Sequence, residues 1–210
     1  MHKRLKRIIC AGTAALVWTL TCVTAWAGVD TAATFQVDSN SWKNWPQGPG
    51  TYGEAAIVMD AGTGSILYAK NIDGHEYPAS ITKVLTSLIA LKYGSLSDQV
   101  TFSNDCISFM QPGDSSVGLK EGNVISLEQA LYATLLASAN EAAYAVAENV
   151  GKNAGHDYNW FIQQMNEECK SLGGENSNFV NANGLHDDNH YTCARDMAVS
   201  YTHLTLPTIY

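Results

Sequence analysis

The chain carries a serine and a lysine three residues apart, Ser80 and Lys83, where an apolar run begins that reaches Leu91. On an α-helix this spacing puts both side chains on one face, one turn apart. A serine hydroxyl attacks well only when a base lies within hydrogen-bond reach. A lysine serves as that base when burial or the positive end of a helix dipole eases the loss of its proton. The pair therefore predicts covalent catalysis by serine, with lysine as the general base.

The same residues also have a purely structural explanation, because serine is a common helix N-cap and lysine is a common helix residue. A second polar pattern, Ser138-Ala139-Asn140, favours the catalytic interpretation. It interrupts apolar helices expected at 126–137 and 141–150, and the first of these opens with a capping box of Ser126 and Gln129. Two apolar helices that meet at such a corner would bury it and point its polar groups into a cavity.

The remaining hydrophobic patterns indicate both strand and helix. Two β-rich segments, 55–59 and 65–69, flank a glycine-containing connection and predict a hairpin. The helix that starts at Ser80 should end near Gly94, and short strands and loops should occupy 100–124. An amphipathic helix with a core-facing stripe and a glycine cap follows: Phe161, Met165, Cys169, Leu172 and Gly173. This order lacks strict βαβ alternation and predicts an α+β fold, with a helical cluster packed on an antiparallel sheet.

The N-terminal 27 residues differ from the rest of the 210-residue chain. A basic start is followed by an apolar stretch over 8–23 and then by Ala25-Trp26-Ala27, a small-x-small cleavage pattern. Residues 1–27 are therefore predicted to be a secretory signal peptide, which implies an exported protein, extracellular or periplasmic and associated with the cell envelope. An uncleaved membrane anchor is the alternative.

Charge and cysteine content restrict the partners of the exported chain. Removing residues 1–27 takes away four basic and no acidic residues, so the formal net charge falls from −8 to −12. Nucleic acid and anionic surfaces are thereby disfavoured as partners, because binding to them depends on basic patches. Three cysteines remain, Cys106, Cys169 and Cys193, and an odd number leaves at least one thiol unpaired. We expect core residues, or at most one disulfide.

The two polar patterns together resemble a known family. With 181–185 (Asn-Ala-Asn-Gly-Leu) and 190–192 (His-Tyr-Thr), the patterns at 80–83 and 138–140 are similar to the serine D-alanyl-D-alanine carboxypeptidases. These are the low-molecular-mass penicillin-binding proteins, relatives of the serine β-lactamases. The resemblance runs from about Ala55 to Ala198 and implies the β-lactamase/transpeptidase-like fold.

The resemblance implies a role for each matching residue. Ser80 would attack the carbonyl between the two terminal D-alanines of a peptidoglycan stem peptide, releasing D-alanine and leaving an acyl-enzyme. Lys83 would act as general base, Ser138 would relay a proton, and Asn140 would orient the substrate amide and Lys83. The backbone N–H of Ser80 would be one oxyanion-hole donor. β-Lactams would acylate Ser80 because they imitate the D-alanyl-D-alanine end. Neither a cofactor nor a metal is implied.

The chain also departs from the family pattern. The third family motif, Lys-Thr/Ser-Gly on a sheet-edge strand, does not occur in the 210 residues, and the sequence from Thr202 onward stops resembling the family. We therefore expect a C-terminally truncated chain with an incomplete sheet, without the family's C-terminal membrane-binding segment, and with its catalysis in doubt. We expect a mature N-terminal segment over 28–53 and a partial penicillin-binding domain over 54–200. An unrelated or misread end is expected over 201–210. Natural divergence at a short C-terminus is the alternative.

Two other functions remain open from the sequence. A serine β-lactamase should carry a Glu-x-x-Leu-Asn loop after Asn140 to position the deacylating water, and no such pattern is found. The Ser-Ala-Asn form of the second pattern also favours a carboxypeptidase. A non-catalytic wall-binding or β-lactam-sensing module is the other alternative, but such a module has no need of an intact nucleophile and base.

Two further candidate sites have simpler explanations. His186 and His190 have i, i+4 spacing with two aspartates between them, which is compatible with zinc. However, Asn183-Gly184 predicts a turn just before them, and no further ligand cluster is evident. Glu141 could be proposed as a base, but a carboxylate in the first turn of a helix is more simply explained by the helix dipole.

Overall fold

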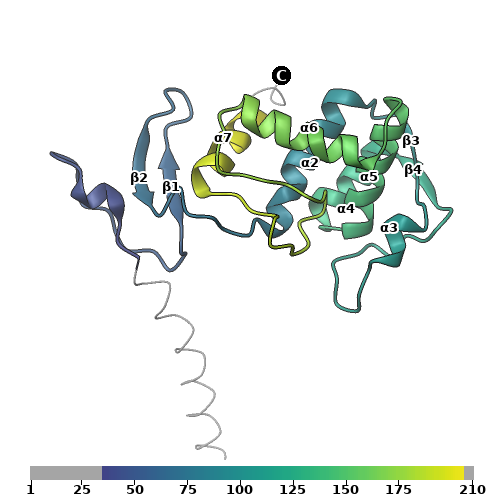
Figure 1. Ribbon diagram of the computed structural model, residues 1–210, viewed down its shortest axis with the longest axis horizontal. Coiled ribbons are helices and arrows are strands. Elements are labelled where there is room, and N and C mark those ends of the chain that lie inside the picture. Colours follow the sequence, from purple (N-terminus) through teal and green to yellow (C-terminus); the bar gives the residue numbers. More distant parts are fainter. Residues whose placement is uncertain (1–34, 206–210) are drawn as a thin grey trace, which may run out of the picture. The chain divides into compact units, whose positions relative to one another are not determined.

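The chain divides into two compact units, with the boundary between Asn71 and Ile72. The first unit contains a β-hairpin. The computed structural model describes residues 35–205 (Figure 1), so the predicted signal peptide lies outside the described residues. Strands β1 (Ala56–Met59) and β2 (Ile66–Lys70) pair antiparallel, which confirms the predicted hairpin. Its turn is closed by Asp60, whose carboxylate accepts hydrogen bonds from the N–H and hydroxyl of Thr63.

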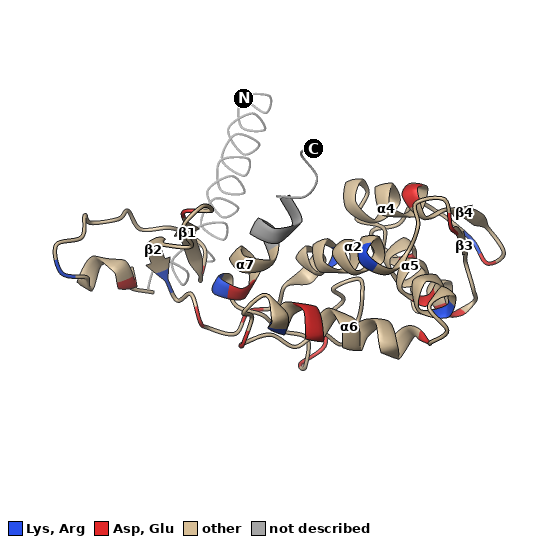
Figure 2. Ribbon diagram, turned by 90° about the horizontal axis from the view of Figure 1, so that it is seen from above, with Lys and Arg blue, Asp and Glu red and all other residues tan. Residues whose placement is uncertain are grey.

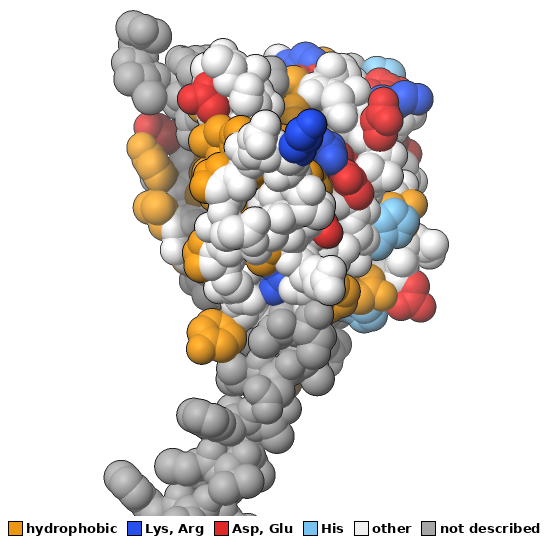
Figure 3. Space-filling view, turned by 90° about the vertical axis from the view of Figure 1, so that its left-hand side faces the viewer, with side chains coloured by type: hydrophobic (Ala, Val, Ile, Leu, Met, Phe, Trp, Pro, Cys, Tyr) orange, Lys and Arg blue, Asp and Glu red, His pale blue; other side chains and the backbone are white. Residues whose placement is uncertain are grey.

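The segment before the hairpin contains one short 3-10 helix, η2 (Asp38–Ser41), and is otherwise irregular up to residue 53. Side chains fasten it to the hairpin. The indole of Trp45 donates to the carbonyl of Leu67 at 2.8 Å, and the buried ammonium of Lys70 donates to the carbonyls of Thr51 and Gly53 at 2.7 Å. Several apolar side chains of this unit remain partly exposed: Phe35, Trp42, Tyr52, Val58 and Leu67. Figure 3 shows apolar side chains on the surface of the molecule.

Four helices form the core of the second unit: α2 (Thr82–Tyr93), α4 (Leu127–Leu136), α5 (Asn140–Asn153) and α6 (Tyr158–Ser171). Helix α5 contacts the other three. Its face is built of small residues, and the fully buried Ala142, Ala145 and Val146 let neighbouring helices approach closely. Within the described part of the chain, charged residues are scattered over the helices rather than gathered in one basic stripe (Figure 2).

A two-stranded ribbon packs against this cluster. Strands β3 (Gln99–Thr101) and β4 (Val124–Ser126) pair antiparallel and contact α4 and α5. The loop between them carries α3 (Asp105–Ser108), a helix too short for hydrophobic periodicity to indicate. Helices together with small antiparallel sheets confirm the predicted α+β class.

The predicted helix ends are largely confirmed. At one of them, the C-terminus of α2, the reason for the glycine differs from the one expected. The capping box is present, since Gln129 N–H donates to Ser126 Oγ and the Gln129 side chain accepts from Ser126 N–H. Gly173 follows α6 with a left-handed φ of 96°. Gly94 ends α2 in an extended conformation, however, with φ of −115°. Glycine is needed there because a Cβ would lie 2.8 Å from the side chain of Leu127.

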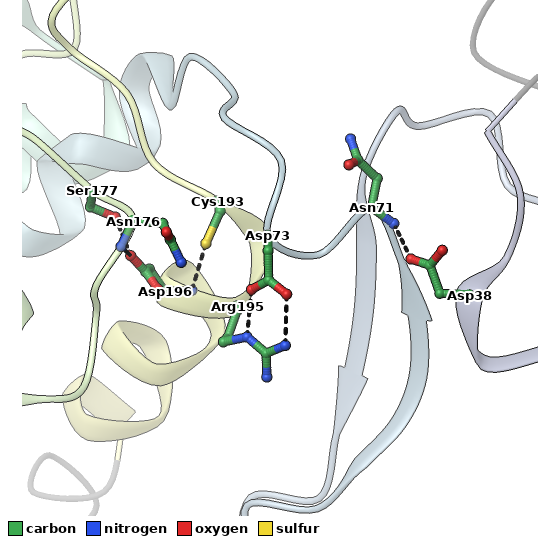
Figure 4. Close-up of polar contacts among 8 residues, drawn as sticks. All are labelled: Asp38, Asn71, Asp73, Asn176, Ser177, Cys193, Arg195 and Asp196. Atoms are coloured by element: carbon green, nitrogen blue, oxygen red, sulfur yellow. Dashed lines mark hydrogen bonds and ion pairs between the residues drawn. The ribbon is translucent and has the colours of Figure 1, made fainter. Parts of the chain in front are cut away.

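Polar contacts join the start of α7 (Ala194–Thr205) to the segment before α2 and to the segment after α6. The guanidinium of Arg195 donates to both carboxylate oxygens of Asp73, at 2.6 and 2.8 Å (Figure 4). Asp196 is buried, and one of its oxygens accepts from the N–H of Asn176 and the hydroxyl of Ser177. The backbone of α7 continues to Thr205, so the segment predicted to be unrelated is helical up to that residue.

The three cysteines of the described chain are all buried and unpaired, which agrees with the expectation of core residues. Burial raises the pKa of each thiol, that of Cys193 to about 11. Over residues 35–205, none of the helices combines the length and apolar character required to cross a bilayer.

Candidate active site

Ser80 lies in a single 3-10 turn, η3 (Ala79–Ile81), immediately before α2, and Lys83 lies in the first turn of α2. The distance from Lys83 Nζ to Ser80 Oγ is 3.0 Å. The turn is tight, since Ala79 adopts a left-handed φ of 47°. Gly184 approaches it so closely that a Cβ at Gly184 would lie 1.8 Å from the Ala79 carbonyl oxygen. The 181–185 segment therefore abuts the nucleophile's turn, and only glycine allows this.

The ammonium of Lys83 makes three hydrogen bonds. Besides Ser80 Oγ, it donates to Asn140 Oδ1 at 2.8 Å and to the Asn183 carbonyl at 2.7 Å. The side chain is buried, with 2% of the residue exposed. Burial lowers the pKa of Lys83 to about 8, while the negative charge of Glu141 acts in the opposite direction. At pH 7 about one molecule in ten therefore holds Lys83 as a neutral amine.

Ser138 occupies the corner between α4 and α5, as the sequence predicts. Its φ of 55° is left-handed, and its hydroxyl donates to Ser80 Oγ at 2.8 Å. In the two residues that follow, Ala139 N–H donates to the Ala133 carbonyl and Asn140 N–H donates to the Ser115 carbonyl. These bonds fix the corner so that the Ser138 hydroxyl reaches Ser80.

The structure thus brings the four predicted residues into one hydrogen-bonded group. Ser80 Oγ receives hydrogen bonds from Lys83 and Ser138, and Asn140 receives one from Lys83. Asn140 is buried at the start of α5, where its side chain points to Lys83 rather than capping the helix. Such an arrangement can move a proton from Ser80 to a lysine amine and can exchange it through the Ser138 hydroxyl.

The carbonyl of Asn183 is a contact for which residue types gave no indication. A backbone oxygen has no sequence signature, although the Asn-x-Asn-Gly pattern marks the turn that presents it. Asn183 also lines a hollow of about 450 Å3, together with Phe109, Tyr144, Tyr158 and Leu185 among others. Ser80, Lys83, Ser138 and Asn140 are not among the residues that line this hollow, and Asn183 is the residue that connects it to Lys83.

The two histidines considered as metal ligands have other contacts. Val180 N–H donates to His190 Nδ1, so the proton lies on His190 Nε2, which donates to Thr82 Oγ1 at 2.8 Å. Burial lowers the pKa of His190 to about 4 and keeps it neutral. His186 is exposed and packs edge-on against Tyr77. Among residues 35–200, no group of three or more His, Cys, Asp and Glu side chains could hold a metal ion.

Glu141 has the predicted position at the start of a helix, and it also makes contacts that this position does not indicate. It lies in the first turn of α5, but it is buried and its carboxylate accepts hydrogen bonds from the Ser116 hydroxyl and the Val117 N–H. The interaction with a distant loop, 24 to 25 residues away in sequence, was not predictable from the helix position.

Comparison with known proteins agrees with this geometry. A family model described as D-alanyl-D-alanine carboxypeptidase matches residues 43–206. The chain is 31% identical over 177 residues to the D-alanyl-D-alanine carboxypeptidase DacA of Haemophilus influenzae, covering 82% of this chain and 44% of that protein. It is 34% identical over 151 residues to DacF of Bacillus subtilis, covering 70% of this chain and 37% of that protein.

Solved structures show the same similarity. Penicillin-binding protein 5 from Haemophilus influenzae superposes with a TM-score of 0.68 at 30% identity, covering 78% of this chain and 48% of that one. The Streptomyces K15 DD-transpeptidase superposes with a TM-score of 0.64 at 27% identity, covering 70% of this chain and 58% of that one. The chain spans less than half the length of the DacA and DacF relatives. With its fold and most of its length matched, the chain belongs to the D-alanyl-D-alanine carboxypeptidase family.

Proposed function

We propose that the protein is a serine-type D-Ala-D-Ala carboxypeptidase that removes the terminal D-alanine from peptidoglycan stem peptides through an acyl-enzyme on Ser80. One observation carries the proposal: Ser80 Oγ lies 3.0 Å from Lys83 Nζ and 2.8 Å from Ser138 Oγ, in a chain of this family. The proposed setting is the cell envelope, outside the cytoplasmic membrane, where the predicted signal peptide would deliver the protein.

The contacts of Lys83 explain how it would act as a base. A neutral amine has two N–H bonds and one lone pair. The two strong acceptors, Asn140 Oδ1 and the Asn183 carbonyl, would take the two hydrogens. The lone pair then faces Ser80 Oγ, the remaining partner. Lys83 would accept the serine proton as Oγ attacks the carbonyl carbon between the two D-alanines.

Proton return to the leaving group would use Ser138. Collapse of the tetrahedral intermediate breaks the C–N bond, and the departing amine needs a proton. Lys83 would supply it through the Ser138 hydroxyl, which is already hydrogen-bonded to Ser80 Oγ. D-Alanine leaves and Ser80 carries the acyl group as an ester. A water molecule that gives its proton back along the same route would hydrolyse the ester and restore Ser80. The Ser80 N–H would bind the oxyanion, and loss of such a donor typically costs about 10²–10³ in rate.

Ser80→Ala tests the proposal in the full-length protein. The variant should lose covalent labelling by a fluorescent penicillin and lose D-alanine release from a stem peptide, because no other hydroxyl lies between Lys83 and Ser138. Intact-mass spectrometry would show the acyl adduct on the wild-type protein alone. Unchanged labelling of Ser80→Ala would remove Ser80 as the nucleophile.

Two assays on the wild-type protein separate the competing functions. A carboxypeptidase should release D-alanine with turnover and hydrolyse penicillin only slowly, whereas a β-lactamase should do the reverse. A protein that binds penicillin non-covalently and releases no D-alanine would be a wall-binding or β-lactam-sensing module instead.

A further inference from the structure

The buried carboxylate of Glu141 has an unusual set of contacts. Only 1% of the residue is exposed. One oxygen, Oε1, accepts from Ser116 Oγ at 2.6 Å and from Val117 N–H at 2.8 Å. The other oxygen, Oε2, is buried and has no hydrogen-bond partner within the described chain. Burying a carboxylate with one oxygen unpaired costs stability. A structural link alone could be made more cheaply by a neutral side chain.

The carboxylate holds a loop against the Ser138–Asn140 corner. Three hydrogen bonds connect them: the two to Glu141 and the one from Asn140 N–H to the Ser115 carbonyl at 2.9 Å. Ser116 Oγ in turn accepts from Gly118 N–H, which keeps the loop folded on itself. Because Asn140 is also a hydrogen-bond partner of Lys83, the loop, the corner and the lysine form one connected network.

The same carboxylate is the charged group that acts on Lys83. The elements packed against α2 carry other charges as well: Glu128 on α4, Glu148 and Lys152 on α5, Glu167, Glu168 and Lys170 on α6, and Arg195 and Asp196 on α7. Among the described residues, Glu141 is the charged group with a resolved effect on the pKa of Lys83, which it raises. Glu168 is paired with Lys92 and Arg195 with Asp73. The polar groups that touch Lys83, namely Ser80, Asn140 and the Asn183 carbonyl, are uncharged.

We propose that Glu141 is a positioning residue of the active site, which holds the 115–117 loop and Asn140 in place and sets the pH at which Lys83 can act. The inference rests on the proposed function, since it assumes that Lys83 is the base. The proposed role of Glu141 requires no contact between Glu141 and the substrate. The carboxylate acts on the reaction through Asn140 and through its charge.

Three substitutions separate the charge from the hydrogen bonds. Glu141→Gln removes the charge and retains an oxygen that can accept from Ser116 and Val117. Glu141→Asp retains the charge but is one methylene shorter and cannot reach both donors. Ser116→Ala removes one hydrogen bond and leaves the charge in place.

The measurement is the second-order acylation rate constant with a fluorescent penicillin, between about pH 5 and pH 10, in the full-length protein. Loss of the negative charge lowers the pKa of Lys83, so the rising limb of the profile should move to lower pH in Glu141→Gln. At a given pH on that limb, acylation should therefore be faster in Glu141→Gln than in the wild-type protein. Ser116→Ala and Glu141→Asp should leave the limb in place, and Glu141→Asp should lower the plateau rate about tenfold.

The results that would overturn the role of Glu141 differ from the result that would contradict the proposed function. A limb that stays at the wild-type pH in a folded Glu141→Gln protein would overturn the electrostatic role. If Glu141→Gln fails to fold, as judged by thermal denaturation, Glu141→Asp decides: a wild-type plateau would overturn the positioning role. A wild-type protein that penicillin does not acylate at all would instead contradict the proposed function.

Discussion

At the scale of single residues, the proposed mechanism makes the pKa of Lys83 decide the pH at which the site reacts. Burial lowers the lysine pKa from 10.5 to about 8, and its hydrogen-bond acceptors are uncharged oxygens. A carboxylate in direct contact would stabilise the ammonium and oppose its role as base. The neighbouring amide and carbonyl instead orient the amine without holding its proton strongly.

A pH dependence follows from this value. The base must be neutral, so the acylation rate should rise about tenfold per pH unit below 8 and level off above it. The pH profile of fluorescent penicillin acylation under single-turnover conditions measures this directly. A flat profile between about pH 6 and pH 8 would show that loss of the Lys83 proton does not limit the reaction.

Lys83→Arg is the matched control for that profile. Arginine keeps the positive charge and the capacity to donate hydrogen bonds, but it stays protonated throughout this pH range. Its acylation rate should fall by about 10²–10⁴ or more and lose the rising limb. A near-normal rate would remove Lys83 from the role of base.

At the scale of elements, the close approach of the 181–185 segment to η3 gives a stability prediction. Gly184→Ala should destabilise the fold by about 3 kcal/mol or more, because the new Cβ would collide with the Ala79 carbonyl and the φ of 83° is left-handed. Gly155→Ala is the control, since Gly155 has nearly the same φ, 84°, with open space around its Cβ position. That variant should lose only about 1 kcal/mol.

Urea denaturation of the two glycine variants separates the two causes. A common backbone strain would make both variants equally unstable. Only a steric collision at η3 makes Gly184→Ala the worse of the two, and it should also reduce penicillin acylation because the nucleophile's turn would have to move. Equal losses would contradict the close approach.

The elements that the sequence predicts well are those with local causes. The hairpin and the capping box depend on residues a few positions apart, and both are present. The Ser80–Lys83 pair is equally local, although Ser80 lies in the 3-10 turn before α2 and not in the α-helix that was expected to start there. Gly94 was correctly expected to end α2, but its reason is a packing contact with Leu127, which no local pattern contains.

The parts of the site that the sequence does not predict depend on distant contacts. Glu141 reaches Ser116 and Val117 in a loop whose conformation has no periodic pattern. The hydrogen bond between His190 and Thr82 spans 108 residues, so the spacing of the two histidines gives no indication that His190 is a neutral core histidine. The helix pattern predicts a polar corner at 138–140 that faces a cavity, and the resemblance to the family adds the expectation that Ser138 lies beside Ser80.

At the scale of the whole molecule, the buried thiols give a test of the core. Cys106, Cys169 and Cys193 are inaccessible, and burial raises the pKa of each, so little reactive thiolate forms at neutral pH. In the native protein none of the three should be alkylated by iodoacetamide over an hour or so at pH 7.5, whereas all three should react in denaturant. Peptide mass mapping assigns each position, and rapid native labelling of any one would show that its surroundings open.

Two of the hydrogen-bond partners of Lys83 are synthesised long after the lysine itself. Its two acceptors lie 57 and 100 residues further along, at Asn140 and Asn183. A nascent chain that has emerged only as far as α4 already holds the serine and the lysine one turn apart. It still lacks both partners that aim the amine and part of the burial that lowers its pKa. On the proposed mechanism, Ser80 is therefore not activated until the chain beyond Asn183 has folded.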